Sequence, residues 1–244
     1  MAGLSMDGSN PDVSLLYDIN GIAADAPGWA DRLVEYVGEY GILLGLVLVA
    51  LWCWWRGRTR GSAEDSVASA AAIVWAPLAA GIALLVNIPI RSFVERPRPF
   101  LEHKGLEVLV AGKTDFSFVS DHATLAMAVA IGVFMANRRW GLLSIALACA
   151  EGFCRVYMGV HYPTDVVGGF ALGTAVTLLL APLALMLLTP AVGALSRWGA
   201  TRFLVRSRSA RERDAERRTA APAGQARAAV EARQDGSGYN GLAA

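Results

Sequence analysis

Long runs of apolar residues dominate the hydrophobic pattern of this chain. Residues 66–90 contain no charged side chain, and a helix needs about 20 such residues to cross a bilayer. Four further stretches are predominantly apolar, at about 33–55, 122–137, 140–157 and 164–188. The pattern therefore predicts five membrane-spanning helices.

The segments between these runs are polar or contain helix breakers. Residues 11–30 alternate apolar and acidic positions before a Pro-Gly pair, which predicts a short interfacial helix followed by a turn. Residues 91–121 are polar and punctuated by prolines, so we expect a loop with room for one short surface helix. The predicted fold class is all-α, a polytopic membrane bundle of about five transmembrane helices plus an N-terminal interfacial helix.

Composition and charge support a membrane protein and give its orientation. The chain is 55% apolar with a mean hydropathy of +0.41, which is high for a soluble globule. Its net charge of +1 conceals an asymmetry, because residues 1–39 hold seven acids and one arginine, whereas residues 197–244 hold ten arginines and five acids. By the positive-inside rule, the arginines at 56–60, at 138–139 and in the tail are cytoplasmic. We expect the membrane and its lipids as partners, and no nucleic acid.

The chain divides into three parts on this basis. They are an external or interfacial segment (1–30), a transmembrane domain (31–190) and a basic cytoplasmic tail (191–244) that we expect to be partly disordered. Cys53, Cys149 and Cys154 show no CxxC or metal-ligand spacing, which predicts neither a disulfide framework nor a zinc site. The acidic N-terminus lacks the basic start and apolar core of a cleavable signal peptide. The oligomeric state is left open.

Three segments with ionisable side chains fall on the outer side in this topology. They are Arg91-Ser-Phe-Val-Glu-Arg-Pro-Arg98-Pro99, Ser117-Phe-Val-Ser120-Asp121-His122, and the stretch from Cys154 to Asp165. Charged groups at membrane depth are costly and rare, so a cluster of them where helices surface indicates a functional site.

The residue types in these segments suit phosphoryl transfer. Arginine binds phosphate oxygens as a planar, permanently charged fork, and the segments supply Arg91, Arg98 and Arg155. Ser120 stands at an expected helix N-cap, so its hydroxyl and the backbone amides of Asp121 and His122 would face the same anion. The predicted site is a phosphate cradle of side chains and backbone.

Two histidines complete the predicted chemistry. His161 lies four residues before Asp165, with Pro163 between them, so a tight turn can bring the carboxylate onto the imidazole. A carboxylate bonded to one ring nitrogen fixes the tautomer and makes the other nitrogen more nucleophilic. His161 would then attack phosphorus, and His122 would protonate the leaving oxygen.

Together the three segments resemble the signature of the type 2 phosphatidic acid phosphatase superfamily, lipid phosphatases related to bacterial acid phosphatases and vanadium haloperoxidases. The family motifs are Lys-x6-Arg-Pro, Pro-Ser-Gly-His and Ser-Arg-x5-His-x3-Asp. Here they read Arg91-x6-Arg98-Pro99, Val119-Ser120-Asp121-His122 and Cys154-Arg155-x5-His161-x3-Asp165. The order and both long spacings match, over roughly residues 30–190.

The resemblance implies that His161 is the nucleophile forming a phosphohistidine, Asp165 its partner and His122 the general acid. It implies that the other motif residues bind phosphate, without a metal or cofactor: Arg91, Arg98, Ser120, Asp121 and Arg155. The chain departs from the motifs at four positions, Arg91 for lysine, Val119 for proline, Asp121 for glycine and Cys154 for serine. The Ser-Asp-His form with Arg-Pro-Arg-Pro-Phe resembles the undecaprenyl-diphosphate phosphatase branch.

The expected activity is hydrolysis of undecaprenyl diphosphate to undecaprenyl phosphate at the external face of a bacterial inner membrane. Two alternatives stay open, a phosphatidylglycerophosphate or phosphatidic acid phosphatase, and a non-catalytic lipid-phosphate binding or transport protein. Arg96 is either a secondary anion contact or a headgroup anchor. Glu151, four residues before Arg155, is expected to orient that arginine, and the glycines of the last span (168, 169 and 173) to allow close helix packing.

Overall fold

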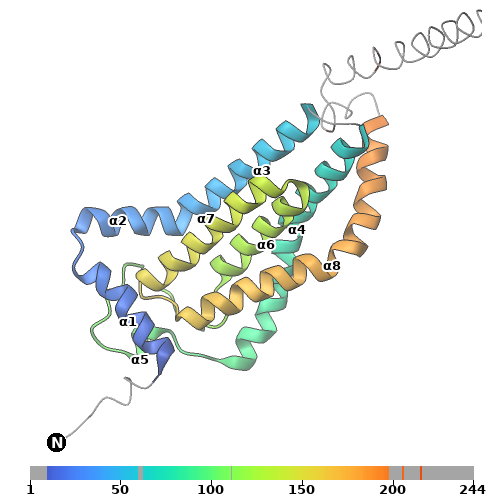
Figure 1. Cartoon of the computed structure of the whole chain (residues 1–244). Helices are drawn as coiled ribbons and strands as arrows, with labels where there is room; N and C mark the ends of the chain where they lie inside the picture. Colours follow the sequence, from blue (N-terminus) through green and yellow to red (C-terminus); the bar gives the residue numbers. More distant parts are fainter. Residues whose placement is uncertain (1–9, 60–62, 111, 198–204, 206–214, 216–244) are drawn as a thin grey trace, which may run out of the picture.

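The computed structural model describes residues 10–59, 63–110 and 112–197, with the isolated residues 205 and 215. Within these ranges it is helical and has no β-strand. Its elements are α1 (Pro11–Ala24), α2 (Gly28–Tyr36), a π-helical turn η2 (Val37–Gly41), α3 (Ile42–Thr59), α4 (Ala63–Val94), α5 (Pro99–Glu102), α6 (Asp121–Ala136), α7 (Arg138–Tyr157) and α8 (Pro163–Arg197). Figure 1 shows a bundle of long helices with α1 and α5 at one end. The predicted disorder of the tail lies outside the described residues.

Helix α6 forms the centre of the bundle and contacts α4, α7 and α8. Its buried side chains are mostly small, among them Ala123, Ala126, Ala128, Ala130 and Gly132. A methyl group at Gly132 would collide with Ala76 of α4, and one at Gly169 of α8 would lie 2.8 Å from the Ser120 carbonyl oxygen. A methyl group at Gly173 of α8 would collide with the Thr124 carbonyl oxygen of α6. The close packing predicted for these two glycines of the last span is confirmed.

The five predicted apolar segments all coincide with helices. Within the described part of the chain, three helical segments are long and apolar enough to cross a membrane, Gly28–Thr59, Glu64–Glu102 and Pro163–Arg197, and α6 is a shorter apolar helix. Large apolar side chains on their outer surfaces are exposed, for example Leu44, Leu85 and Leu179, as expected where the solvent is lipid. The structure is a helical membrane bundle, and the number of crossings stays a prediction.

The outer helices are longer than their apolar runs. Helix α4 begins at Ala63 and passes Arg91 to end at Val94, and α8 continues to Arg197. Acids in the first turn of α4 and an arginine in the last turn of each helix complement the helix dipole, so the helical backbone continues beyond the apolar stretch. Two prolines lie inside each helix, a position that membrane bundles tolerate.

Helix α1 packs against the end of the bundle that carries the motif segments. Its buried positions include Leu16 and Asn20, and it contacts α7 and α8. The Asn20 side-chain amide donates to the carbonyls of Glu107 and Tyr157, each at 2.8 Å, and its oxygen accepts from the Glu107 amide at 2.9 Å. The helix predicted to be interfacial therefore also holds the long loop after α5 against α7.

A π-helical turn joins α2 to α3 and brings an acidic side chain into the bundle. Gly38 in this turn is buried, and a methyl group there would lie 2.7 Å from the Cβ of Cys154 in α7. Such turns add one residue per turn and occur often at functional sites. Here the turn places Glu39 against the motif residues of α7.

Candidate active site

The three motif segments meet at one end of the bundle. They are the C-terminal end of α4 with its following loop, the N-terminus of α6, and the turn between α7 and α8, all at the α5 end in Figure 1. The predicted residues form two neighbouring clusters there. One surrounds His161 and the other surrounds Arg155.

His161 is buried in the turn between α7 and α8, with its tautomer fixed by the backbone. Its Nδ1 lies 2.9 Å from the carbonyl oxygen of Ser117. A carbonyl can only accept, so Nδ1 carries the hydrogen and Nε2 keeps its lone pair. Nε2 lies 3.4 Å from a terminal nitrogen of Arg98. The unprotonated nitrogen therefore accepts from a guanidinium group that also suits phosphate.

Asp165 supports this arrangement indirectly. The predicted tight turn is present, but the carboxylate lies 3.7 Å from His161 Nδ1, which is too long for a hydrogen bond. Instead Asp165 Oδ2 accepts from the Ser117 hydroxyl and from the Tyr162 amide at 2.9 Å. The direct carboxylate–imidazole bond expected from the spacing is replaced by a link through Ser117, because the backbone carbonyl of Ser117 reaches the ring first.

Burial lowers the pKa of His161 below its ordinary value of 6.5. The Asp165 carboxylate opposes this shift, and the positive charges of Arg98 and Arg155 add to it. A desolvated ring beside two guanidinium groups resists a second proton. His161 therefore stays neutral, as the predicted nucleophilic role requires.

Arg96 pairs with two carboxylates, contacts that the sequence did not predict. Its guanidinium donates to Asp165 Oδ1 at 2.8 Å and to Asp12 Oδ2 at 2.6 Å, and it lies 3.6 Å from the centre of the Tyr162 ring. Asp12 in turn accepts from the Thr164 amide at 2.9 Å. Arg96 therefore positions Asp165 and ties α1 to the start of α8.

Arg98 and Arg91 share a counter-ion that the motifs do not contain. Arg98 is buried and donates to Asp115 Oδ1 at 2.7 Å and to the Val160 carbonyl at 2.9 Å, and Arg91 donates to Asp115 Oδ2 at 2.9 Å. Burial alone would raise the pKa of Asp115, but Arg98 and then Arg91 lower it below the usual range. A carboxylate that stays ionised holds both guanidinium groups in place.

The N-terminus of α6 faces the same region, as predicted. The Ser120 hydroxyl accepts from the Ala123 amide at 3.4 Å, so the serine is the helix cap. The amides of Asp121 and His122 occupy the first two helical positions, which have no partner within a helix and suit an anion. The Asp121 carboxylate pairs with Arg91 and accepts from Asn87 at 2.7 Å. Its negative charge is thus compensated.

The second cluster surrounds Arg155, which is buried. Arg155 donates to Glu39 Oε2 at 2.9 Å and to the Gly38 carbonyl at 2.6 Å, and its Nε lies 3.1 Å from Glu151. The predicted ion pair with Glu151 is confirmed. His122 belongs to this cluster, with its Nε2 3.8 Å from Glu39 Oε1.

Sequence reasoning missed Ser117, Asp115, Glu39 and Lys113. Ser117 and Asp115 precede the second motif closely, and an isolated polar residue there gives no sign of the partners that it contacts in the fold. Glu39 lies 116 residues before Arg155 in the chain, and only the packing of η2 on α7 brings them together. Among the described residues, no three His, Cys, Asp or Glu side chains are grouped as metal ligands.

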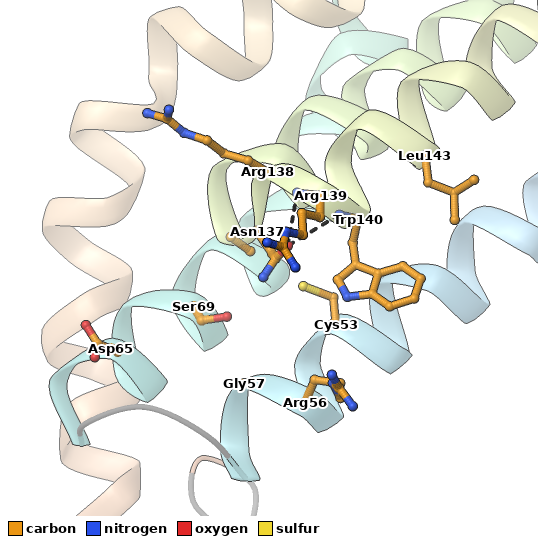
Figure 2. A pocket seen from close by; sticks show the side chains of 11 residues that line it. Cys53, Arg56, Gly57, Asp65, Ser69, Asn137, Arg138, Arg139, Trp140 and Leu143 are labelled. Carbon is orange, nitrogen blue, oxygen red and sulfur yellow. Dashed lines mark hydrogen bonds between the residues drawn. The ribbon is translucent and has the colours of Figure 1, made fainter.

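A cavity of about 680 Å³ lies at the opposite end of the bundle. Figure 2 shows it between α3, α4 and the turn from α6 to α7, with Cys53, Arg139 and Trp140 around it. None of the predicted site residues lines it. Its arginines belong to the loops that the charge bias predicts to be cytoplasmic.

Comparison with known proteins identifies the family. The PAP2 superfamily model matches residues 72–187. Decaprenylphosphoryl-5-phosphoribose phosphatase of Mycobacterium tuberculosis (strain ATCC 25618 / H37Rv) is 33% identical over 170 residues, which cover 68% of this chain and 86% of that protein. The chain belongs to the PAP2 superfamily.

Two further similarities are informative. Undecaprenyl-diphosphatase BcrC of Bacillus subtilis (strain 168) is 30% identical over 139 residues, 57% of this chain and 66% of that protein. The crystal structure of the first transmembrane PAP2 type phosphatidylglycerolphosphate phosphatase from Bacillus subtilis is 21% identical. It has a TM-score of 0.51 and covers 75% of this chain and 89% of that one. The second similarity supports the membrane-bundle fold of this PAP2 protein.

Proposed function

We propose that this PAP2 protein is a metal-independent lipid phosphatase that removes the terminal phosphate of undecaprenyl diphosphate through a phosphohistidine. The observation that carries the proposal is the bond from His161 Nδ1 to the Ser117 carbonyl. It leaves the Nε2 lone pair facing Arg98, whose terminal nitrogen lies 3.4 Å away. Simple anion binding needs no such nucleophile.

In the first step, the Nε2 lone pair of His161 attacks the terminal phosphorus. A nitrogen–phosphorus bond forms, and the bond from phosphorus to the bridging oxygen breaks. The electron pair of that bond moves to the leaving lipid phosphate, which needs no proton, whereas the leaving oxygen of a monoester would receive its proton through His122. Arg98 and the α6 amides hold the transferred group, whose charge spreads over its oxygens.

In the second step, water attacks the phosphohistidine. Neutral His122 takes the proton from water, and the nitrogen–phosphorus bond breaks with its electron pair returning to His161. Inorganic phosphate leaves. Asp165, Ser117 and Arg96 keep the ring in the same orientation throughout, which preserves the attacking geometry for the next cycle.

A His161→Ala variant tests the nucleophile. Release of phosphate from undecaprenyl diphosphate by the protein purified in detergent should fall by at least about 1,000-fold, because a lost nucleophile removes the covalent route. His103→Asn is the matched control, because His103 lies outside both clusters, between Tyr17 and Tyr162. It should keep most of its activity. Undiminished activity in His161→Ala, or a loss of wild-type activity with a chelator, would contradict the proposal.

The same assay can determine which lipid phosphate the protein prefers as its substrate. BcrC is named for undecaprenyl diphosphate, whereas the mycobacterial relative is named for a decaprenylphosphoryl phosphoribose. Undecaprenyl diphosphate, phosphatidylglycerophosphate and phosphatidic acid should be compared in one assay, and we expect the diphosphate to have the highest kcat/KM. Binding of lipid phosphate without product would support a binding or transport protein instead.

We also propose that the site faces the outside of a bacterial plasma membrane and that the C-terminus is cytoplasmic. The arginines of the α3–α4 and α6–α7 connections support this orientation. The substrate would place its headgroup between the two clusters while its chain stays in the bilayer.

A further inference from the structure

Three donor groups converge on a single carboxylate beside the cluster that surrounds His161. Lys113 Nζ lies 3.0 Å from Glu39 Oε1, and His122 Nε2 lies 3.8 Å from the same oxygen. Arg155 donates to the other oxygen, Oε2, at 2.9 Å. Glu39 is therefore surrounded as a bound anion would be.

The cluster around Arg155 is held by fixed contacts and is open to solvent. Arg155 is fixed by the Gly38 carbonyl and by Glu151, and its side chain is 1% exposed. Lys113, His122 and Glu39 are 28%, 22% and 15% exposed. A ligand entering from the loop side can therefore reach the ammonium group and the imidazole without unfolding a helix.

The charge of Arg155 can be neutralised without Lys113. Glu151 lies 3.1 Å from Arg155 on the same helix, and Glu39 adds a second carboxylate. Lys113 adds a further positive charge from a separate loop. Carboxylate and phosphate oxygens are bound by the same ammonium and guanidinium donors, so the group that suits Glu39 also suits a phosphate.

The cluster lies on the leaving-group side of the proposed reaction. The transferred phosphate belongs beside Arg98 and His161, and the proposed mechanism places the leaving oxygen beside His122. The group beyond His122 is then the remainder of the substrate. In a diphosphate, that remainder begins with a second phosphate.

We propose that Lys113 and Arg155 form a subsite for the leaving phosphate of a lipid diphosphate, which Glu39 occupies when substrate is absent. The inference rests on the proposed function and assigns binding residues to the second phosphate of its diphosphate substrate. When substrate binds, the second phosphate replaces the Glu39 carboxylate between the two cations.

The subsite matches the chemistry of the leaving group. When the bond from the terminal phosphorus to the bridging oxygen breaks, the electron pair moves onto the leaving phosphate. That group has a second pKa of about 6, so it leaves without a proton and is stabilised by positive charge. An alkoxide leaving from a monoester has a proton affinity closer to that of hydroxide, whose conjugate acid, water, has a pKa of about 15.7, and it needs the proton of His122.

The test compares two variants on two substrates. Lys113→Gln should lower kcat/KM for undecaprenyl diphosphate by about 10- to 100-fold, the usual cost of losing one charged contact to a developing anion, and should change phosphatidic acid hydrolysis little. His122→Asn should do the reverse and impair the monoester more. Lys104→Gln, in the same loop but with its side chain exposed, is the matched control and should behave as wild type on both.

A second variant tests whether Glu39 occupies the subsite when substrate is absent. Glu39→Gln removes the internal anion with which the substrate competes, so the KM for the diphosphate should fall. A rise in that KM would overturn the proposed replacement of the Glu39 carboxylate by the second phosphate. Size-exclusion elution of each variant shows whether it keeps its fold.

The outcomes separate this inference from the proposed function. Equal losses on both substrates in Lys113→Gln, or wild-type hydrolysis of phosphatidic acid alone, overturn the subsite and leave the phosphatase standing. Wild-type protein without activity on any lipid phosphate overturns the proposed function itself. If the wild-type protein hydrolyses only the diphosphate, the two variants are compared on that substrate. A fall in kcat/KM in Lys113→Gln but not in Lys104→Gln supports the subsite. An unchanged kcat/KM in Lys113→Gln overturns it.

Discussion

At the scale of single residues, the environment of His161 decides what the site can do. A carbonyl acceptor fixes the tautomer, whereas a carboxylate held 3.7 Å away contributes charge and holds Ser117. The backbone of Ser117 orients the ring, and the charge of Asp165 acts on its protonation. The two contributions can therefore be measured apart.

The pH dependence of activity should report the lowered pKa of His161. Its ring is neutral and nucleophilic above the pKa of the folded protein, which burial lowers below 6.5. As the pH rises, kcat/KM should therefore increase with a midpoint below 6.5. Asp165 opposes the lowering, so Asp165→Asn should move this midpoint further down. A wild-type midpoint above 6.5, measured over a pH series, would contradict the assignment.

Ser117→Ala separates the hydroxyl from the carbonyl. The variant keeps the carbonyl that accepts from His161 but loses the hydroxyl that donates to Asp165. We expect kcat to fall by about 10- to 100-fold with KM little changed, as is usual when the support of a reacting group is loosened. Ser92→Ala, at an exposed position of α4, is the control. An unchanged kcat would show that the hydroxyl has no positioning role.

At the scale of elements, close contacts of α6 with its neighbours position both clusters. Alanine and glycine let α4, α7 and α8 approach its backbone, and close approach of backbones is the main source of helix association in membranes. The N-terminus of α6 then lies beside the start of α8, where the Ser120 amide donates to the Asp165 carbonyl at 3.1 Å. A change in this packing should affect stability and site geometry together.

Gly173→Ala tests this packing. The new methyl group would collide with the Thr124 carbonyl of α6, so the free energy of unfolding should fall by about 1–3 kcal/mol, the usual cost of overpacking. Gly81→Ala in α4 is the control, because nothing lies within 4 Å of its added methyl group, and it should be neutral or slightly stabilising. Thermal unfolding in detergent measures both. Equal melting temperatures would show that α6 and α8 are not tightly packed there.

At the scale of the whole molecule, the two ends of the bundle differ in composition. One carries both charged clusters and α1, and the other carries the cavity lined by Arg56 and Arg139 (Figure 2). A bilayer core of about 30 Å would separate the two ends. The orientation proposed above follows from the arginines that lie at the cavity end.

Thiol labelling in intact cells tests this orientation. In a Cys149→Ser background, since Cys149 is the exposed native thiol, Lys104→Cys should react with an impermeant reagent and Arg138→Cys should not. Both positions are exposed and lie at opposite ends of the bundle. Labelling of Arg138→Cys alone would reverse the orientation and place the site inside.

The sequence by itself determined the class of fold, the five helices and the residues of the three motifs. These features depend on local quantities, namely the length of apolar runs, the position of helix breakers and the spacing of charged residues. Helix ends were less predictable, because α4 and α8 continue past their apolar stretches where end charges favour the helix.

Only the tertiary structure decided how the site is held. The carbonyl of Ser117 at His161, the salt bridge from Arg96 to Asp165 and the position of Glu39 between Lys113 and Arg155 all join residues distant in the chain. Their pairing depends on which backbones approach closely around α6 and where a π-helical turn aims one side chain. No local pattern encodes such distances, so a motif names the reacting groups while the fold selects their partners.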